Sequence, residues 1–250
     1  MSVTAKRQMN LYNIPSLVDA DKMNFENTTR NMMLNHLWIA RNFSIKSRKP
    51  FQWLLKRLLD LSLSIFGIIL ISPLLILLAA AIKLESKGPV LFKQIRLGLY
   101  GKKFYMYKFR SMKDDADKQF HVVKDMNETN DIMFKASNDP RITKIGRFIR
   151  KYSLDELPQL INVLKGEMSL VGPRPPIIRE VELYNKWHYL RFTTIPGLTG
   201  LWQVSGRARI KDFDNVVKLD YKYMENWNLM LDLSLLAKTI PAVIFAKGAG

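Results

Sequence analysis

The stretch IILISPLLILL at residues 68–78 places a Ser-Pro pair inside a run that is otherwise apolar enough to enter a membrane. No ionisable side chain occurs between residues 61 and 82, and a helix of that length reaches across the hydrocarbon layer of a bilayer. Pro73 removes a backbone donor, which leaves the carbonyl of Ile69 without its helical partner. Because water cannot satisfy that carbonyl in hydrocarbon, the pair costs stability unless it shapes the segment for a purpose.

Basic residues flank the apolar run on both sides. They are Lys46, Arg48, Lys49, Lys56 and Arg57 before it, and Lys83, Lys87, Lys93 and Arg96 after it. Lys and Arg mark the cytoplasmic ends of membrane segments, so both ends of this run are expected on the same side. Hydropathy alone leaves a plain spanning helix as the alternative. We expect a re-entrant helix that bends at Ser72 and Pro73, with the Ser72 hydroxyl bonding a carbonyl that the break frees.

The composition indicates an anionic partner. The 250 residues include 39 Lys+Arg and 22 Asp+Glu, which gives a formal net charge of +17. This balance suits nucleic acid, anionic lipid or a phosphorylated substrate and does not choose among them. The lack of cysteine excludes disulfides, cysteine-based zinc sites and thiol nucleophiles. The histidines, His36, His121 and His188, do not have metal-ligand spacing.

Three parts can be distinguished along the chain. Residues 1–50 are polar and rich in Asn and are expected as a helical or partly disordered extension. Residues 51–87 carry the membrane helix, and residues 88–250 form a cytosolic domain that stays against the membrane. The expected fold class is α+β and helix-rich: a membrane-monotopic protein with a re-entrant, Pro-kinked helix, amphipathic interfacial helices and a small β-hairpin or sheet.

Periodicity predicts the elements of the third part. Alternation in residues 88–112, with Gly98 and Gly101 between two runs, predicts a β-hairpin. One face is expected to carry Tyr105, Tyr107 and Phe109, and the other Met106, Lys108 and Arg110. A basic amphipathic helix is expected over residues 142–151 and a second helix over residues 160–164, ending at Gly166. Residues 195–207 are expected to form a turn-rich loop, and residues 212–226 and 232–245 further helices.

Two groups of acidic residues are candidates for chemistry. Asp115 and Asp117 have the D-x-D spacing with which many nucleotide-sugar transferases bind a divalent metal, although the same residues suit a solvated helix face. Asp155 and Glu156 precede Pro158. If Ser153 capped a helix here, the proline would fall inside it, so the helix is expected to begin near Pro158. The two carboxylates then lie at a helix start, where they could hold a metal or act as nucleophile and partner; capping or surface roles stay open.

The sequence GPRPP at residues 172–176 is a candidate phosphate-binding loop. Prolines on both sides of Arg174 hold the backbone extended and fix the direction of its side chain. A guanidinium held in this way suits a bidentate grip on phosphate. A stiff connector with a solvent-facing arginine is the alternative. Lys108 and Arg110 on the hairpin, together with Arg207, could add positive charge to the same site.

Three motifs in this order resemble the bacterial sugar transferase family, the monotopic phosphoglycosyl transferases that act on polyprenyl phosphate. The motifs are KFRSM at residues 108–112, SLDELPQLINVLKGEMSLVGPRP at residues 153–175 and PGLTGLWQVSGR at residues 196–207, after the apolar segment. The resemblance covers roughly residues 50–250 and agrees with the re-entrant helix expected from the flanking charges.

The resemblance implies a reaction and roles for several residues. A sugar-1-phosphate would pass from a UDP-sugar to undecaprenyl phosphate with release of UMP, which starts polysaccharide or glycan assembly. Asp155 matches the family's nucleophile, which forms a covalent phosphosugar–aspartyl intermediate and holds Mg²⁺, and Glu156 matches its partner. Lys108, Arg174 and Asp232 match further active-site positions.

The implied setting is the cytoplasmic face of a bacterial inner membrane. The expected partners are the UDP-sugar, undecaprenyl phosphate and anionic membrane lipids, with no nucleic acid; a homodimer is left open. Ser205 and Phe213 differ from the residues common in the family, which leaves the identity of the transferred sugar open. The residues of the third motif resemble those of members that handle glucose or galactose more than those that handle N-acetylated sugars. Two alternatives stay open: a D-x-D glycosyltransferase that releases UDP, and a non-catalytic basic membrane adaptor.

Overall fold

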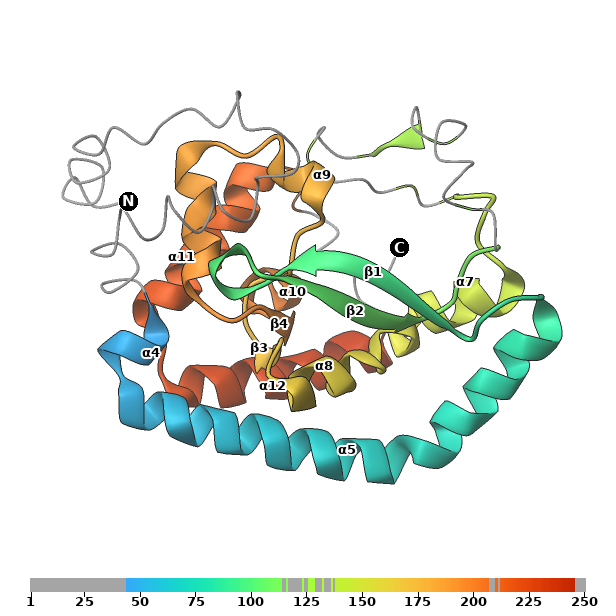
Figure 1. Cartoon of the computed structure of the whole chain (residues 1–250), viewed down its shortest axis with the longest axis horizontal. Coiled ribbons are helices and arrows are strands. Elements are labelled where there is room, and N and C mark those ends of the chain that lie inside the picture. The colour runs from blue at the N-terminus through green and yellow to red at the C-terminus, as the bar shows by residue number, and fades with distance from the viewer. Residues whose placement is uncertain are drawn as a thin grey trace.

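The longest element of the protein is helix α5 (Pro50–Glu85), which follows the short helix α4 (Ile45–Arg48). The computed structural model describes residues 44–113, 116, 123, 126–128, 132, 136, 138–206, 210 and 212–245. Helix α5 has 36 residues, so it is about 54 Å long. It runs along one edge of the molecule and changes direction in its second half (Figure 1). Within the described part of the chain it is the one helix long and apolar enough to cross a membrane.

Helix α5 continues through the Ser-Pro pair without interruption. The Ser72 hydroxyl donates to the Ile69 carbonyl at 2.8 Å, and this is the carbonyl that loses its helical donor to Pro73. The prediction that Ser72 satisfies a carbonyl freed by the proline is confirmed. The helix includes the whole apolar run of residues 61–82 and extends beyond it at both ends.

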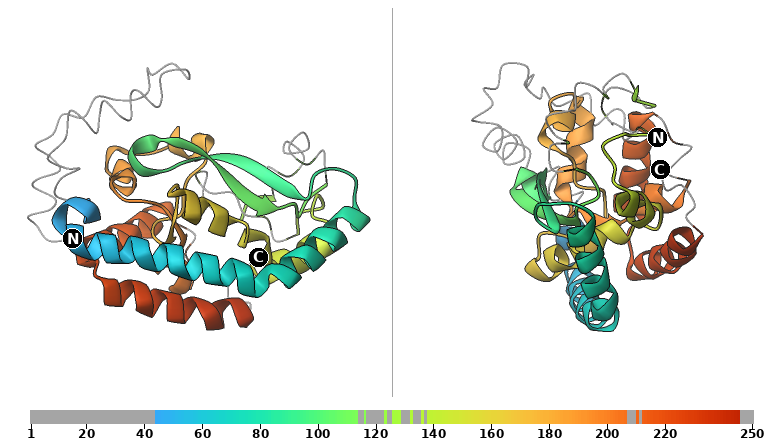
Figure 2. Two further views of the ribbon diagram at one scale, coloured as in Figure 1. Left: turned by 60° about the horizontal axis from the view of Figure 1, so that its bottom comes forward. Right: turned by 90° about the vertical axis from the view of Figure 1, so that its right-hand side faces the viewer.

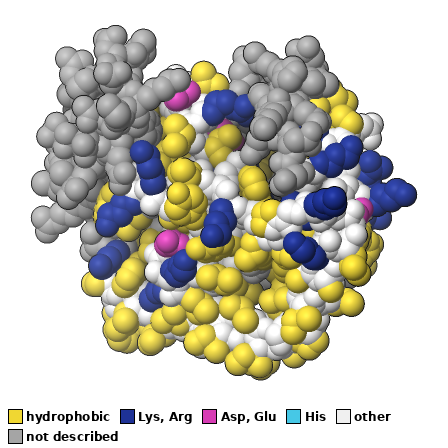
Figure 3. Space-filling model, turned by 45° about the vertical axis from the view of Figure 1, so that its right-hand side comes forward, with side chains coloured by type: hydrophobic (Ala, Val, Ile, Leu, Met, Phe, Trp, Pro, Cys, Tyr) yellow, Lys and Arg dark blue, Asp and Glu magenta, His cyan; other side chains and the backbone are white. Residues whose placement is uncertain are grey.

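One side of α5 is exposed and strongly apolar. Its exposed large side chains include Phe51, Leu54, Leu58, Ile65, Phe66, Ile69, Leu70, Ile76 and Leu77. Helix α12 (Leu229–Ile244) lies alongside α5 (Figure 2) and adds exposed Met230 and Ile240. Hydrophobic side chains cover much of the lower part of the face drawn in Figure 3. Soluble proteins rarely leave so large an apolar surface uncovered, so the helix-rich fold fits a monotopic membrane protein.

The predicted β-hairpin is present. Strand β1 (Leu91–Leu97) pairs antiparallel with β2 (Lys103–Phe109), and the turn between them contains the 3₁₀ helix η2 (Leu99–Gly101). Tyr105 is exposed, whereas Phe109 is buried because the end of β2 packs against Leu78 and Ile82 in the second half of α5.

The rest of the protein is a succession of short elements packed on the inner side of α5. In chain order they are α7 (Lys144–Lys151), η4 (Leu154–Glu156), α8 (Gln159–Lys165), β3 (Ser169–Val171), α9 (Ile178–Val181), η5 (Lys186–Thr193), β4 (Gly197–Thr199), α10 (Leu201–Val204), α11 (Phe213–Asn226) and α12. Gly166 ends α8 with a φ of 80°, as predicted. The expected turn-rich loop at residues 195–207 is wrong, because β4 and α10 lie there.

Two features hold these elements in place. Strands β3 and β4 pair in parallel, with Ser169 opposite Gly197 and Val171 opposite Thr199. The first half of α5 is attached to the body through polar side chains. The Lys56 ammonium lies 2.6 Å from the Asp232 carboxylate of α12, and Asp60 accepts a hydrogen bond from the backbone N–H of Leu170 at 3.0 Å. These polar side chains of α5 thus face the body of the protein, and its exposed apolar side chains face outward.

Candidate active site

Asp155 and Glu156 lie on a single 3₁₀ turn, η4, directly before helix α8. Ser153 has a left-handed backbone, with a φ of 52°, and its side chain makes no capping hydrogen bond. The capping box is therefore wrong, and α8 begins after Pro158, as the position of the proline predicts. Asp155 is 8% exposed.

Lys108 of β2 faces both carboxylates. Its ammonium lies 2.7 Å from Oε1 of Glu156 and 4.0 Å from Oδ2 of Asp155. Two adjacent negative charges repel one another, and a cation at this distance offsets that repulsion. The structure therefore brings together three of the residues that the sequence singled out: Lys108, Asp155 and Glu156.

Asn162 connects strand β2, which carries Lys108, to helix α8, which follows the Asp155–Glu156 dyad. Its Oδ1 accepts from the backbone N–H of Tyr107 at 3.0 Å, and its Nδ2 donates to the carbonyl of Tyr105 at 2.7 Å. Asn162 is fully buried. Its amide replaces a missing strand partner for β2 and fixes where Lys108 stands relative to Asp155 and Glu156.

Arg174 projects from the loop that follows β3. The close approach of Gly172 to Gly197 permits this loop to lie against β4, since a Cβ on Gly197 would fall 2.0 Å from the backbone nitrogen of Gly172. The Arg174 side chain is 33% exposed and its Nη1 lies 3.4 Å from the buried carboxylate of Glu180. A long contact of this kind restrains the guanidinium and leaves part of it open.

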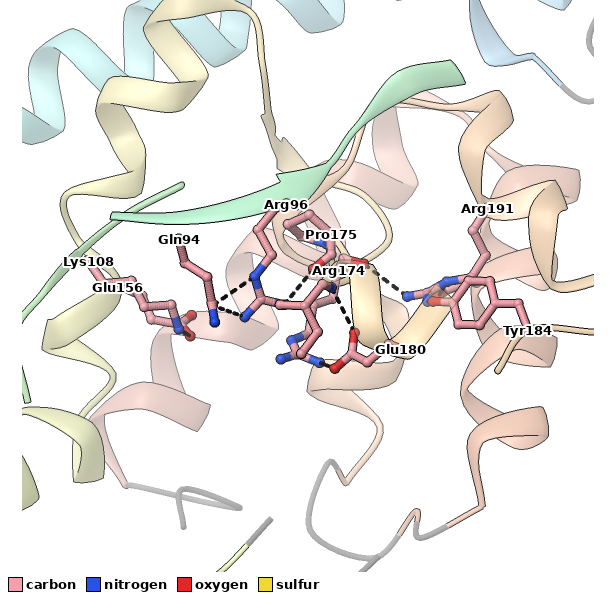
Figure 4. Close-up of polar contacts among 11 residues, drawn as sticks. Gln94, Arg96, Lys108, Glu156, Arg174, Pro175, Glu180, Tyr184 and Arg191 are labelled. Atoms are coloured by element: carbon pink, nitrogen blue, oxygen red, sulfur yellow. Dashed lines mark hydrogen bonds and ion pairs between the residues drawn. The ribbon is translucent and has the colours of Figure 1, made fainter. Parts of the chain in front are cut away.

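Arg96 of β1 lies between the Asp155–Glu156 dyad and the arginine loop (residues 173–176), and Figure 4 shows a row of side chains from Lys108 to Arg191. Arg96 donates to the side-chain oxygen of Gln94 and to the carbonyl of Pro175. Burial and then the charge of Arg174 lower the pKa of Arg96 to about 9, while Glu180 and Glu156 partly offset this. The row is a cationic strip with acidic residues at two points, an arrangement that suits a phosphorylated ligand.

Two predicted site residues lie in other surroundings. Arg110 donates to the carbonyls of Ser86 and Lys87, so it caps the end of α5. Asp232 is 4% exposed and accepts from Lys56, Tyr223 and Trp227, in the contact between α5 and the body. Arg110 and Asp232 thus both take part in contacts that hold α5.

Several predictions fall outside the described residues. These are Arg207, the D-x-D candidates Asp115 and Asp117, and residues 1–43 of the N-terminal extension. No group of three or more His, Cys, Asp or Glu that could hold a metal ion occurs among the residues that the structure describes.

The dyad nevertheless fits a Mg²⁺ ion shared with a substrate. Mg²⁺ prefers carboxylate and phosphate oxygens and keeps several waters, so one or two protein carboxylates suffice when a diphosphate supplies the remaining ligands. Asp155 and Glu156 provide such carboxylates, and Lys108 lies farther from Asp155 than from Glu156.

Sequence reasoning missed the residues that hold the site. Asn162, Arg96, Glu180, Arg191 and Asp220 were not singled out as site residues. Arg96 was visible only as one of several basic residues after the membrane segment. The contacts of Asn162 with β2 and of Arg191 with Asp220 depend on pairings between distant parts of the chain, which no local pattern reports. Glu180, in contrast, binds the nearby Ile177 and Arg174.

The chain was compared with known proteins. The family model described as bacterial sugar transferase matches residues 51–246. The galactosyl transferase CpsE of Streptococcus agalactiae is 45% identical over 210 residues, which are 83% of this chain and 46% of CpsE. The undecaprenyl-phosphate galactose phosphotransferase of Salmonella typhimurium is 42% identical over 234 residues, 89% of this chain and 47% of that protein.

A shorter relative aligns over most of its length. The exopolysaccharide production protein ExoY of Rhizobium meliloti is 40% identical over 205 residues, 80% of this chain and 90% of ExoY. The chain thus spans about half the length of CpsE and of the Salmonella protein, and nearly all of ExoY.

Proposed function

Because this chain belongs to the bacterial sugar transferase family, we propose that it transfers a hexose-1-phosphate from a UDP-sugar to undecaprenyl phosphate. The products would be UMP and an undecaprenyl-diphospho-sugar, which starts polysaccharide assembly. The observation that carries the proposal is the cluster of Asp155, Glu156 and Lys108 in a protein with a large apolar outer surface, suited to a lipid acceptor. The names of CpsE and of the Salmonella relative favour galactose, and the residues of the third motif favour galactose or glucose.

The first step is attack by the Asp155 carboxylate. A carboxylate is ionised at neutral pH and needs no general base to become a nucleophile. One of its oxygens forms a bond to the phosphorus that carries the sugar. The bond from this phosphorus to the bridging oxygen breaks, and that oxygen leaves with its electron pair as part of UMP. The sugar phosphate remains on Asp155.

The second step regenerates the carboxylate. An oxygen of undecaprenyl phosphate attacks the same phosphorus, the bond to Asp155 breaks, and the electron pair returns to the carboxylate. Both steps bring anions together, which charge repulsion opposes. Lys108 next to the dyad and Arg174 on its loop would offset this repulsion, and Glu156 would hold Lys108 in position. Mg²⁺, held by Asp155 together with the diphosphate, would neutralise charge and help UMP leave.

The membrane arrangement is part of the proposal. Helix α5 would enter the cytoplasmic leaflet of the inner membrane and return through it at the bend that contains Ser72 and Pro73. The basic residues on both sides of the apolar run support this path and would contact anionic lipid headgroups.

The nucleotide product tests the function against its two alternatives. The full chain in lipid nanodiscs would be given undecaprenyl phosphate and a panel of UDP-sugars that includes UDP-galactose and UDP-glucose, and the products separated by chromatography. Release of UMP supports the proposal. Release of UDP would replace it with direct glycosyl transfer by the D-x-D alternative. If neither nucleotide forms but the protein binds anionic lipid in a salt-dependent manner, the adaptor alternative holds.

A further inference from the structure

The backbone carbonyls of the arginine loop, residues 173–176, are all held by donors from elsewhere in the protein. Three of these four residues are prolines, which have no N–H to donate, so the loop has to be fixed mainly through its carbonyls. The contacts are Gly197 N to Pro173 O at 2.8 Å, Arg191 Nη2 to Arg174 O at 3.0 Å, Arg96 Nη1 to Pro175 O at 2.9 Å and Leu97 N to Pro176 O at 3.1 Å.

The carbonyls of Arg174 and Pro175 are bound by guanidinium groups. Arg191 and Arg96 are each 5% exposed, and they approach from η5 and β1, on different sides of the loop. A guanidinium presents several donors in one rigid plane, so it can bind a carbonyl and other partners at the same time. Burying a charged guanidinium costs free energy. The use of two such groups to bind backbone carbonyls therefore indicates that the position of these carbonyls is important for the site.

Arg191 is itself fixed at three points. Its Nε donates to Asp220 of α11 at 2.8 Å, and its Nη1 donates to the Tyr184 hydroxyl at 2.6 Å. Asp220 is 1% exposed. The third point is the Arg174 carbonyl. The group therefore connects α11, the η5 segment and the loop through a single planar side chain.

The charges of this network leave an excess on Arg174. Arg96, Arg174 and Arg191 carry three positive charges, and Glu180 and Asp220 carry two negative ones. Of these five side chains, only that of Arg174 is a third exposed; those of Glu180, Arg191 and Asp220 are at most 5% exposed. An anion that approaches from solvent therefore meets the network at Arg174.

We propose that Arg191 and Arg96 are positioning residues, which fix the backbone carbonyls of Arg174 and Pro175 so that the Arg174 guanidinium is aimed at the diphosphate of the sugar donor. The identity of that anion rests on the proposed function. If this is so, weakening the contact between Arg191 and the loop should lower the affinity for the diphosphate only while Arg174 is present.

The test is a double-mutant cycle on the binding of UDP. Isothermal titration with UDP and Mg²⁺ would be carried out on the full chain in nanodiscs for the wild type, Arg191→Lys, Arg174→Gln and the double variant. A lysine can still pair with Asp220 but cannot reach Tyr184 and the loop carbonyl together. We expect Arg191→Lys to weaken UDP binding about tenfold in the wild type. In the Arg174→Gln background the further loss should be less than about twofold.

A matched control separates positioning from a general loss of stability. Arg141 is also 5% exposed, pairs with Asp139 at 2.6 Å and donates to the carbonyl of Ala116 at 3.0 Å. None of these partners belongs to the arginine loop. Arg141→Lys should lower the melting temperature as much as Arg191→Lys but leave UDP affinity unchanged.

Two results would overturn the proposal: unchanged UDP affinity in Arg191→Lys, or an equal loss in both backgrounds. If Arg191→Lys does not fold, Tyr184→Phe replaces it, since it removes one contact of Arg191 and keeps the ring. We then expect a loss of about threefold, and unchanged affinity overturns the proposal. A wild type that binds UDP but never releases UMP would refute the proposed function and not the positioning of Arg174.

Discussion

At the scale of single residues, Asp155 and Glu156 are neighbours in sequence with different surroundings. Glu156 makes a short ion pair with Lys108, whereas Asp155 lies at the limit of ion-pair distance from the same ammonium. In the proposed mechanism Asp155 attacks, and the short ion pair of Glu156 orients Lys108 beside it.

The first prediction concerns the covalent intermediate. Incubation with UDP-sugar radiolabelled in the sugar, without lipid acceptor, should attach sugar phosphate to the wild type and release UMP. Asp155→Asn keeps the shape of the side chain but removes its charge, so it should abolish labelling. Glu156→Gln should label, but about a hundredfold more slowly, because Lys108 loses its partner. Labelling of Asp155→Asn at the wild-type level would remove Asp155 as the nucleophile.

His188 gives a second prediction, on pH and stability. It is fully buried; its Nδ1 accepts from the Asn185 N–H, so Nε2 carries the proton and donates to Asp214. Burial lowers the pKa of His188 below its usual 6.5, although the hydrogen bond to Asp214 partly offsets this. The unfolded chain therefore takes up a proton first as the pH falls through 6.5, and stability is lost below that pH.

The measurement is the melting temperature in nanodiscs between about pH 7 and about pH 5.5. Burial raises the pKa of Asp220 to about 6, which acts on stability in the opposite direction in both proteins. The comparison is therefore between their slopes: as the pH falls, the wild type should lose more stability, or gain less, than His188→Gln. Equal slopes in the two proteins would mean that His188 does not titrate differently in the folded state. The other charged groups near the ring, Asp212, Asp214 and Arg191, are present in both proteins.

At the scale of elements, regular periodicity explains what the sequence could predict. The long apolar run, the hairpin, the helix stop at Gly166 and the two C-terminal helices each depend on residues close together in the chain, and they are present. The pairing of β3 with β4 joins Ser169 to Gly197, and no local pattern reports that distance along the chain. The same holds for the site: the acidic pair and Arg174 were visible as motifs, but Asn162 and Arg191 act through contacts with distant segments.

The bend in α5 carries the third prediction. Ser72→Ala leaves the Ile69 carbonyl without a donor, at a point where Pro73 has already removed the backbone one. In hydrocarbon an unsatisfied carbonyl is expensive, and we expect a loss of about 1–3 kcal/mol, measured as a lower melting temperature in nanodiscs.

Ser62 in the same helix is a matched control. Its hydroxyl also donates to a carbonyl four residues earlier, that of Leu58 at 2.8 Å, but no proline interrupts the backbone there. Ser62→Ala should therefore cost less than Ser72→Ala. Equal losses would show that the hydroxyl of Ser72 does not compensate for the proline.

At the scale of the whole molecule, the apolar surface and the polar contacts of α5 lie on opposite sides of one helix. Lys56, Arg57 and Asp60 bind the body of the protein, while side chains such as Leu58 and Ile65 remain exposed. A helix that spans a bilayer alone would be surrounded by lipid along its hydrocarbon-embedded length. The attachment of the first half of α5 to the body therefore favours a protein that lies in one leaflet, with its site close to the membrane surface.

The last prediction tests that arrangement. The chain has no cysteine, so single cysteines at Lys46 and Lys87, both exposed and on opposite sides of the apolar run, would be the only reactive thiols. If α5 is re-entrant, an impermeant maleimide should label both positions in inside-out vesicles and neither in right-side-out vesicles. Basic residues at both ends and a bend stabilised by Ser72 motivate this outcome, because each favours a return to the side of entry. Labelling of the two positions from opposite sides would mean that α5 spans the bilayer, and Lys108 and the dyad would then face the side on which Lys87 is labelled.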